Sequence, residues 1–244
     1  MRAFVFPNIG ITSSQPQLDT IISTLTTLQS TVTTLQATVA TLNNEFNVTE
    51  YDIWTERGRT EIEQRTFKDD MIKYYKRSAW WQRNKLRCMV TDQWHTRGDV
   101  IACHIWMNKT RGKGLAKFGL AVNDLMDNRN GFLALKDIED KFDRKQLCFL
   151  YSPLTDSGKF LVKVLDPTIR DSVIRNSNPP LTFGNVDGFE LQHPSGRFPY
   201  RRLLGFHARC SYKNAKEKGW IPADSVFDEY FNISETASAP DTYV

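Results

Sequence analysis

Three groups of polar residues follow one another along residues 100–144, and their side chains could together catalyse the hydrolysis of a phosphodiester bond. His104 stands in the apolar, β-prone run VIACHIW (100–106), and Asn130 opens the run NGFLAL (130–135). The third group is acidic and comprises Asp137, Glu139, Asp140 and Asp143. Such hydrolysis needs a general base for the attacking water, a divalent ion to stabilise the developing charge, and a group that holds the base in place.

The elements expected around these residues follow the order strand, loop, strand and short helix. Extended segments are predicted at 88–91 and 99–106 around a turn at 92–99, with a further strand at 130–135 and a helical turn at 136–144. More strands are expected at 148–153 and 159–167. Helices are expected at about 60–84 and at 200–220, the latter ended by Gly219. The fold class is therefore α+β, with helices flanking a small strand–strand–helix core.

Each candidate residue also has a purely structural interpretation. His104 could be a buried imidazole bonded to a backbone carbonyl, and Asn130 a turn residue, because Asn-Gly is a common hairpin signal. Glu139 could face solvent on an acidic helix, while Asp143 could brace that helix or pair with Arg144. His207 is expected to pack or hydrogen-bond inside the domain.

Four segments, in order, resemble the HNH endonuclease family. They are RCMVT (87–91), ACHI (102–105), NGFLALKDIEDKFDR (130–144) and PYRRLLGFH (199–207), within a match of roughly 120 of the 244 residues. The resemblance implies an HNH-type ββα-metal core, and it implies hydrolysis of phosphodiester bonds in DNA with a divalent metal ion, Mg²⁺ or Mn²⁺.

The resemblance also assigns roles to individual residues. His104 would be the general base, and Asn130 would orient the strand and loop that carry it. Glu139 occupies the position where the family places a histidine that binds metal, and its carboxylate suits Mg²⁺ or Mn²⁺. Cys103 stands where some HNH proteins have an acidic metal ligand.

The charge distribution favours a polyanionic partner, with double-stranded DNA the first candidate. The overall net charge is +4, while residues 1–50 carry −2 and residues 228–244 carry −4. Residues 51–227 therefore carry a net charge of +10. Two basic groups could contact phosphates without reading sequence. They comprise Lys109, Arg111, Lys113 and Lys117 in one loop, and Arg197, Arg201 and Arg202 further along. An ordinary solvated basic surface is the alternative.

Residues 18–46 show the sharpest periodicity in the chain. Apolar residues alternate at spacings of three and four, which is a heptad pattern with Leu, Val and Phe at a and Ile and Leu at d. The intervening positions are mainly Thr, Ser and Gln. The pattern predicts self-association through a coiled coil, as a dimer or a trimer. A single amphipathic helix that packs on its own domain is the alternative.

The expected domains are an N-terminal segment (1–16), an oligomerising coiled coil (17–47), an HNH-like domain (52–227) and an acidic, disordered tail (228–244). No apolar run approaches the roughly 18 residues that a membrane span needs. Four widely spaced cysteines, with no recognisable signal peptide, predict a reducing intracellular setting.

Two functions from different classes remain open. The first is a metal-dependent HNH nuclease with an oligomerising coil. The second is a catalytically degenerate HNH scaffold, altered at Glu139 and Cys103. Such a scaffold would act as an oligomeric nucleic-acid-binding protein or a virion-type structural protein. An effector-like toxin is a third interpretation, which no residue specifically supports.

Overall fold

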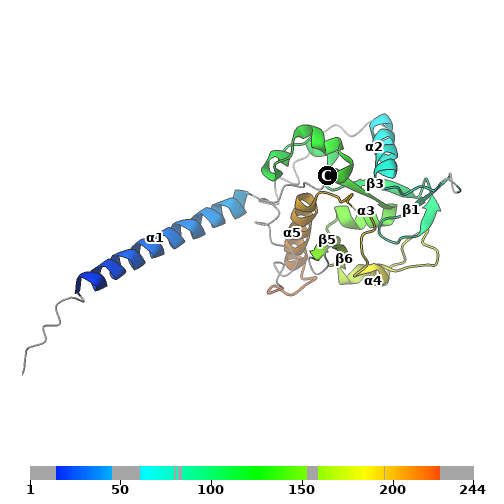
Figure 1. Ribbon diagram of the computed structural model, residues 1–244. Helices are drawn as coiled ribbons and strands as arrows, with labels where there is room; N and C mark the ends of the chain where they lie inside the picture. Colours follow the sequence, from blue (N-terminus) through cyan, green and yellow to red (C-terminus); the bar gives the residue numbers. More distant parts are fainter. Residues whose placement is uncertain are drawn as a thin grey trace, which may run out of the picture. The chain divides into compact units, whose positions relative to one another are not determined.

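The computed structural model describes residues 15–45, 61–79, 81, 84–152, 159–194 and 196–225. Most of the predicted N-terminal segment and the acidic tail lie outside these residues. The chain forms two compact units, residues 1–52 and 53–244. Helices and small antiparallel sheets are mixed in the second unit, so the α+β class is confirmed (Figure 1).

The first unit contains one long helix, α1 (Gln15–Glu45). Thr is a modest helix former, but six threonine hydroxyls here donate to the backbone carbonyl four residues earlier, at 2.9–3.0 Å. Seven large apolar side chains on α1 are between 50% and 59% exposed. They are Leu18, Ile21, Ile22, Leu25, Leu28, Val32 and Leu35. The helix is therefore present, while its association into a coiled coil stays a prediction.

The centre of the second unit is an antiparallel hairpin of β3 (Val100–His104) and β4 (Gly131–Leu135). Helix α2 (Glu61–Tyr74) and helix α3 (Lys136–Asp143) both contact this hairpin. All five residues of β4 are buried, which explains why this strand is a continuous apolar run without alternation. Helix α2 ends about ten residues earlier than the sequence predicts.

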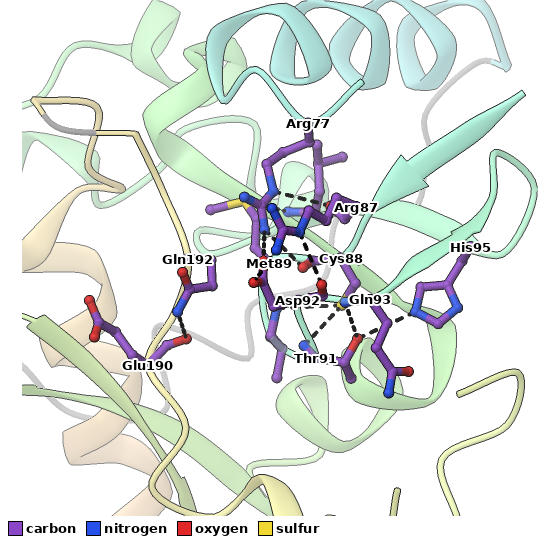
Figure 2. Close-up of polar contacts among 12 residues, drawn as sticks. Arg77, Arg87, Cys88, Met89, Thr91, Asp92, Gln93, His95, Glu190 and Gln192 are labelled. Atoms are coloured by element: carbon purple, nitrogen blue, oxygen red, sulfur yellow. Dashed lines mark hydrogen bonds and ion pairs between the residues drawn. The ribbon is translucent and has the colours of Figure 1, made fainter. Parts of the chain in front are cut away.

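The segment before β3 differs from the prediction. Residues 88–91 form a turn instead of a strand, and the short strands β1 (Lys85–Arg87) and β2 (Trp94–Thr96) flank that turn. Polar contacts hold the turn, as Figure 2 shows: the Cys88 sulfur accepts the N–H groups of Val90 and Thr91, and Asp92 binds Arg77 and Arg87. These local bonds outweigh the β-propensity of the segment.

The turn also supports β4. The backbone N–H of Met89 donates to the carbonyl of Leu133 at 2.8 Å, and the carbonyl of Met89 accepts the N–H of Gln192 at 2.7 Å. The strand that carries Leu133 therefore has β3 on one edge and the 88–89 backbone at the other. This arrangement fixes the strand that opposes His104.

A third hairpin, β5 (Leu147–Ser152) and β6 (Lys159–Val164), packs against helix α5 (Arg201–Glu217). Its apolar contacts include Cys148, Leu150 and Tyr212. Phe132, Phe142 and Phe149 join β4, α3 and β5, with ring centroids 4.9–5.7 Å apart. The region 171–200 contains the short helix α4 (Phe183–Val186). The core thus fixes α3 beside the central hairpin.

Candidate active site

The end of the central hairpin brings His104 and Asn130 close together. His104 pairs with Gly131 in the strand register, and the N–H of Ile105 donates to the carbonyl of Asn130 at 3.0 Å. A Cβ at position 131 would lie 2.5 Å from the carbonyl oxygen of Cys103, so only glycine permits this close strand approach. The Asn-Gly pair therefore opens a strand here instead of forming a two-residue turn.

The side chain of Asn130 is fully buried and makes three hydrogen bonds. Its Oδ1 accepts the N–H of Trp106 at 2.8 Å, and its Nδ2 donates to the carbonyls of Trp106 (3.1 Å) and Leu125 (2.9 Å). Buried amides of this kind fix the backbone they bind, because each lost bond leaves a buried group unpaired. Asn130 thus holds the chain two residues beyond His104.

Helix α3 starts directly after β4 and carries two carboxylates one turn apart, on Glu139 and Asp143. Burial raises the pKa of the Cys103 thiol well above its usual value, and the nearby charges of Glu139 and Asp143 raise it further. The Glu139 and Asp143 carboxylates therefore lie close enough to Cys103 for their charges to act on its thiol. Although Asp143 is an exposed residue, desolvation of its carboxyl raises its pKa to about 6, against the opposing charge of Lys109.

Residues 88–150 match the family model described as HNH endonuclease. This segment is similar to the HNH endonuclease family. The predicted resemblance is confirmed, and the family implies a nuclease-type function that acts on nucleic acid, generally with a divalent metal ion. No curated protein and no solved structure matches the chain significantly, so the family model carries the assignment.

The HNH segment contains a basic loop, residues 107–119, that is built around Trp106. The indole Nε1–H donates to the carbonyl of Lys113 at 3.0 Å, and a Cβ on Gly114 would lie 2.8 Å from the indole ring. Gly114 also has a φ of +87°, which favours glycine. Since Asn130 holds the Trp106 backbone and Trp106 holds Lys113, one buried network supports both the histidine strand and the basic loop.

The basic residues of the two predicted clusters differ in their surroundings. Arg111, Lys113 and Lys117 are exposed on the loop, and Lys109 lies within electrostatic reach of Asp143. Outside the HNH segment, the guanidinium groups of the second cluster contact protein groups. Arg197 donates to the carbonyl of Tyr74, Arg202 donates to that of Phe118, and Arg201 lies 4.2 Å over the Tyr151 ring. These arginines support the fold, and their phosphate role stays a prediction.

The residues of α3 that could hold a metal ion are carboxylates. Glu139 and Asp143 offer oxygen atoms, the kind of ligand that Mg²⁺ and Mn²⁺ prefer, and Mg²⁺ is commonly held by one or two carboxylates plus water. Within the described residues, however, no three His, Cys, Asp or Glu side chains form a cluster that could hold an ion. The chemistry of the two side chains fits such an ion, but they would need water or substrate oxygens to complete its coordination.

Several other polar residues have structural roles. His207 is buried, stacks on Phe142 at 3.6 Å and hydrogen-bonds the Phe142 carbonyl at 2.9 Å, as predicted. Asp99 accepts bonds from Thr96 and Asn176, which lie away from the hairpin end. The interpretation of Asp143 as a helix brace or a partner of Arg144 stays a prediction, and the cation whose charge acts on its carboxyl is Lys109.

One residue near His104 was missed by sequence reasoning. The Phe67 ring, from α2, stacks on the His104 imidazole with centroids 4.0 Å apart and an interplanar angle of 29°. The signal was the four-residue spacing of Phe67, Met71 and Tyr75, which places them on one helix face. Periodicity predicts that this face is buried, but it does not predict which strand it covers.

In the described part of the chain, no helix combines the length and the apolar character that crossing a membrane requires.

Proposed function

We propose that this protein is a metal-dependent endonuclease that hydrolyses phosphodiester bonds in DNA, with His104 as the general base. The observation that carries the proposal is the buried Asn130 amide, whose three hydrogen bonds fix the backbone beside His104 within an HNH segment. An imidazole titrates near neutral pH and can accept the proton of an attacking water. Asn130 acts through the backbone, as a positioning residue.

Glu139 would hold the divalent ion, with Asp143 as a second carboxylate on the same helix face. When bound, the ion supplies positive charge that stabilises the phosphorane and the leaving oxygen. The protein contributes the oxygen donors, and the Cys103 thiol beside them stays protonated because burial and both carboxylates raise its pKa. Mg²⁺ or Mn²⁺ is the ion that such donors favour.

The loop 107–119 would hold the DNA backbone. Its exposed cations Arg111, Lys113 and Lys117 lie on a segment that the Asn130–Trp106 network ties to the His104 strand. Contacts between cations and phosphates give affinity without sequence preference, and they weaken steeply as salt concentration rises. Binding should therefore be non-specific and sensitive to salt.

The test uses the full chain and supercoiled plasmid, with Mg²⁺, Mn²⁺ or chelator. The wild type should nick the plasmid only with a divalent ion. Glu139→Gln should raise the metal concentration that half-maximal nicking requires. If the wild type binds DNA in low salt but cuts nothing with any divalent ion, the enzyme proposal fails. The alternative of a degenerate HNH scaffold that binds nucleic acid would then stand.

One observation favours that alternative specifically. Glu139 stands where the family has a metal-binding histidine, and the fully buried Cys103 stands where some HNH proteins have an acidic ligand. Among the described residues, no cluster of three possible metal donors forms. A scaffold of this kind would bind DNA through the basic loop without turnover. The plasmid experiment separates the two functions, since both predict binding but only one predicts scission.

We also propose that α1 associates with α1 of other copies of the chain. Its seven apolar side chains are about half exposed, and all except Ile22 follow the heptad spacing. They belong to a unit separate from the HNH fold. Leu28→Lys, at a d position, should shift the mass measured by light scattering to that of a monomer. Ser30→Lys, two residues away at an outward position, should leave the oligomer intact. A monomeric wild type would contradict the proposal.

A further inference from the structure

The inner face of α2 closes over the end of the central hairpin. Phe67 and Met71 on α2, and Tyr75 immediately after it, are at most 2% exposed. The Tyr75 hydroxyl donates to the carbonyl of Gly131 at 2.9 Å, the residue that pairs with His104. This helix lies outside residues 88–150, the segment that matches the HNH family.

Gly131 allows the helix to come this close. A Cβ on Gly131 would lie 3.1 Å from both Cζ of Phe67 and Cε of Met71, in addition to its clash with the Cys103 carbonyl. The φ of Gly131 is −168°, ordinary extended backbone, so the requirement for glycine is one of space. Without a side chain at 131, the Phe67 ring reaches across the strand pair to His104.

The contact between Phe67 and His104 is a stack of two ring faces. Their centroids are 4.0 Å apart and the planes differ by 29°, while His104 itself is only half-buried. An imidazole on a strand end can turn about two side-chain torsions, and the second is broad for histidine. A rigid aromatic face, itself fixed by burial, restricts that rotation.

We propose that Phe67 is a positioning residue for the general base, so that α2 is a functional part of the active site. This inference rests on the proposed nuclease function of His104. A general base must come within hydrogen-bond reach of its proton, about 2.6–3.2 Å between heavy atoms. Phe67 holds the imidazole by stacking on one of its faces, while Asn130 holds the backbone two residues beyond His104.

The test compares Phe67→Leu with Met71→Leu in the full chain. Both changes remove contacts from the same buried helix face, but only the first removes the ring that touches His104. Tyrosine is unsuitable at position 67, because its hydroxyl would extend from Cζ toward Gly131. Two quantities are measured for each variant: the kcat and KM of plasmid nicking, and the proton NMR signals of the His104 ring, assigned with His104→Gln.

Phe67→Leu should lower kcat by roughly tenfold or more with KM little changed, since small misplacements of catalytic groups cost up to about a hundredfold. Its His104 ring signals should move downfield as the ring current of Phe67 is lost. Met71→Leu should leave both close to wild type. If the two variants give the same kcat and the same His104 signals, the inference is wrong, even where both lower thermal stability.

The two measurements separate this inference from the function on which it rests. Unaltered His104 signals in an active Phe67→Leu enzyme overturn the positioning role alone. A wild type that never cuts DNA overturns the nuclease function and the catalytic part of this inference together. In that case the NMR comparison still decides whether Phe67 orders the imidazole.

Discussion

Replacing Asn130 with alanine should destabilise the second unit more than any neighbouring polar substitution. The change removes three buried hydrogen bonds and leaves the N–H of Trp106 and two carbonyls without their partner. At about 1 kcal/mol for each net hydrogen bond, the loss is about 3 kcal/mol, within a range of about 2–5 kcal/mol once unpaired groups are included. For a unit of this size the melting temperature should fall by roughly 6–12 °C.

Asn128→Ala is the matched control, two residues away in the same 3₁₀ turn (Asn128–Asn130). Its Oδ1 is buried but has no hydrogen-bond partner among the described residues, so its removal should change stability by less than about 1 kcal/mol. Urea unfolding followed by tryptophan fluorescence gives both free energies. If Asn130→Ala and Asn128→Ala cost the same small amount, Asn130 does not hold the loop, and its proposed positioning role loses its physical basis.

Three further predictions concern acid stability, thiol reactivity and DNA binding. Burial lowers the pKa of His207 to about 3, so between about pH 6.5 and 3 the unfolded chain binds a proton that the folded chain excludes. As the pH is lowered through that window, the free energy of unfolding should decrease by up to about 1.4 kcal/mol per pH unit. His207→Gln should flatten this dependence in acid titrations, and an unchanged slope would contradict the assignment. All four cysteines are buried: Cys88, Cys103, Cys148 and Cys210. A thiol reagent should therefore label none of them quickly in the native protein and all four after unfolding. Rapid labelling of the native protein would be inconsistent with that burial. Lys113→Glu should weaken DNA binding and reduce its salt dependence. Lys218→Glu makes the same charge change at the exposed end of α5 and should weaken binding far less. Equal losses of affinity would show that net charge alone matters.

The strand that carries His104 could be predicted because its sequence pattern is local. The runs around His104 and Asn130 alternate or remain apolar over five residues, and the structure places β3 and β4 at those residues. The helix at 136–144 was equally predictable, since its buried residues Ile138 and Phe142 are one turn apart. The family resemblance then ordered these elements correctly along the chain.

The errors came from interactions between residues that propensity cannot register. Residues 88–91 favour a strand by composition, yet the Cys88 sulfur accepts two backbone N–H groups and Asp92 binds two arginines, which stabilises a turn. The stack of Phe67 on His104 joins residues 37 positions apart, and it depends on the missing side chain of Gly131. Nothing in the pattern of α2 specifies that its buried face meets the histidine.

The central claim is that His104 is the base of a phosphodiester hydrolase, and single-turnover nicking of supercoiled plasmid tests it most directly. Wild type, His104→Gln and His193→Gln are compared at equal DNA occupancy with saturating Mn²⁺. His193 lies in a loop and hydrogen-bonds the Pro194 carbonyl, so its variant should cut at the wild-type rate. His104→Gln should be slower by about a hundredfold or more. Equal rates for all three proteins would contradict the account.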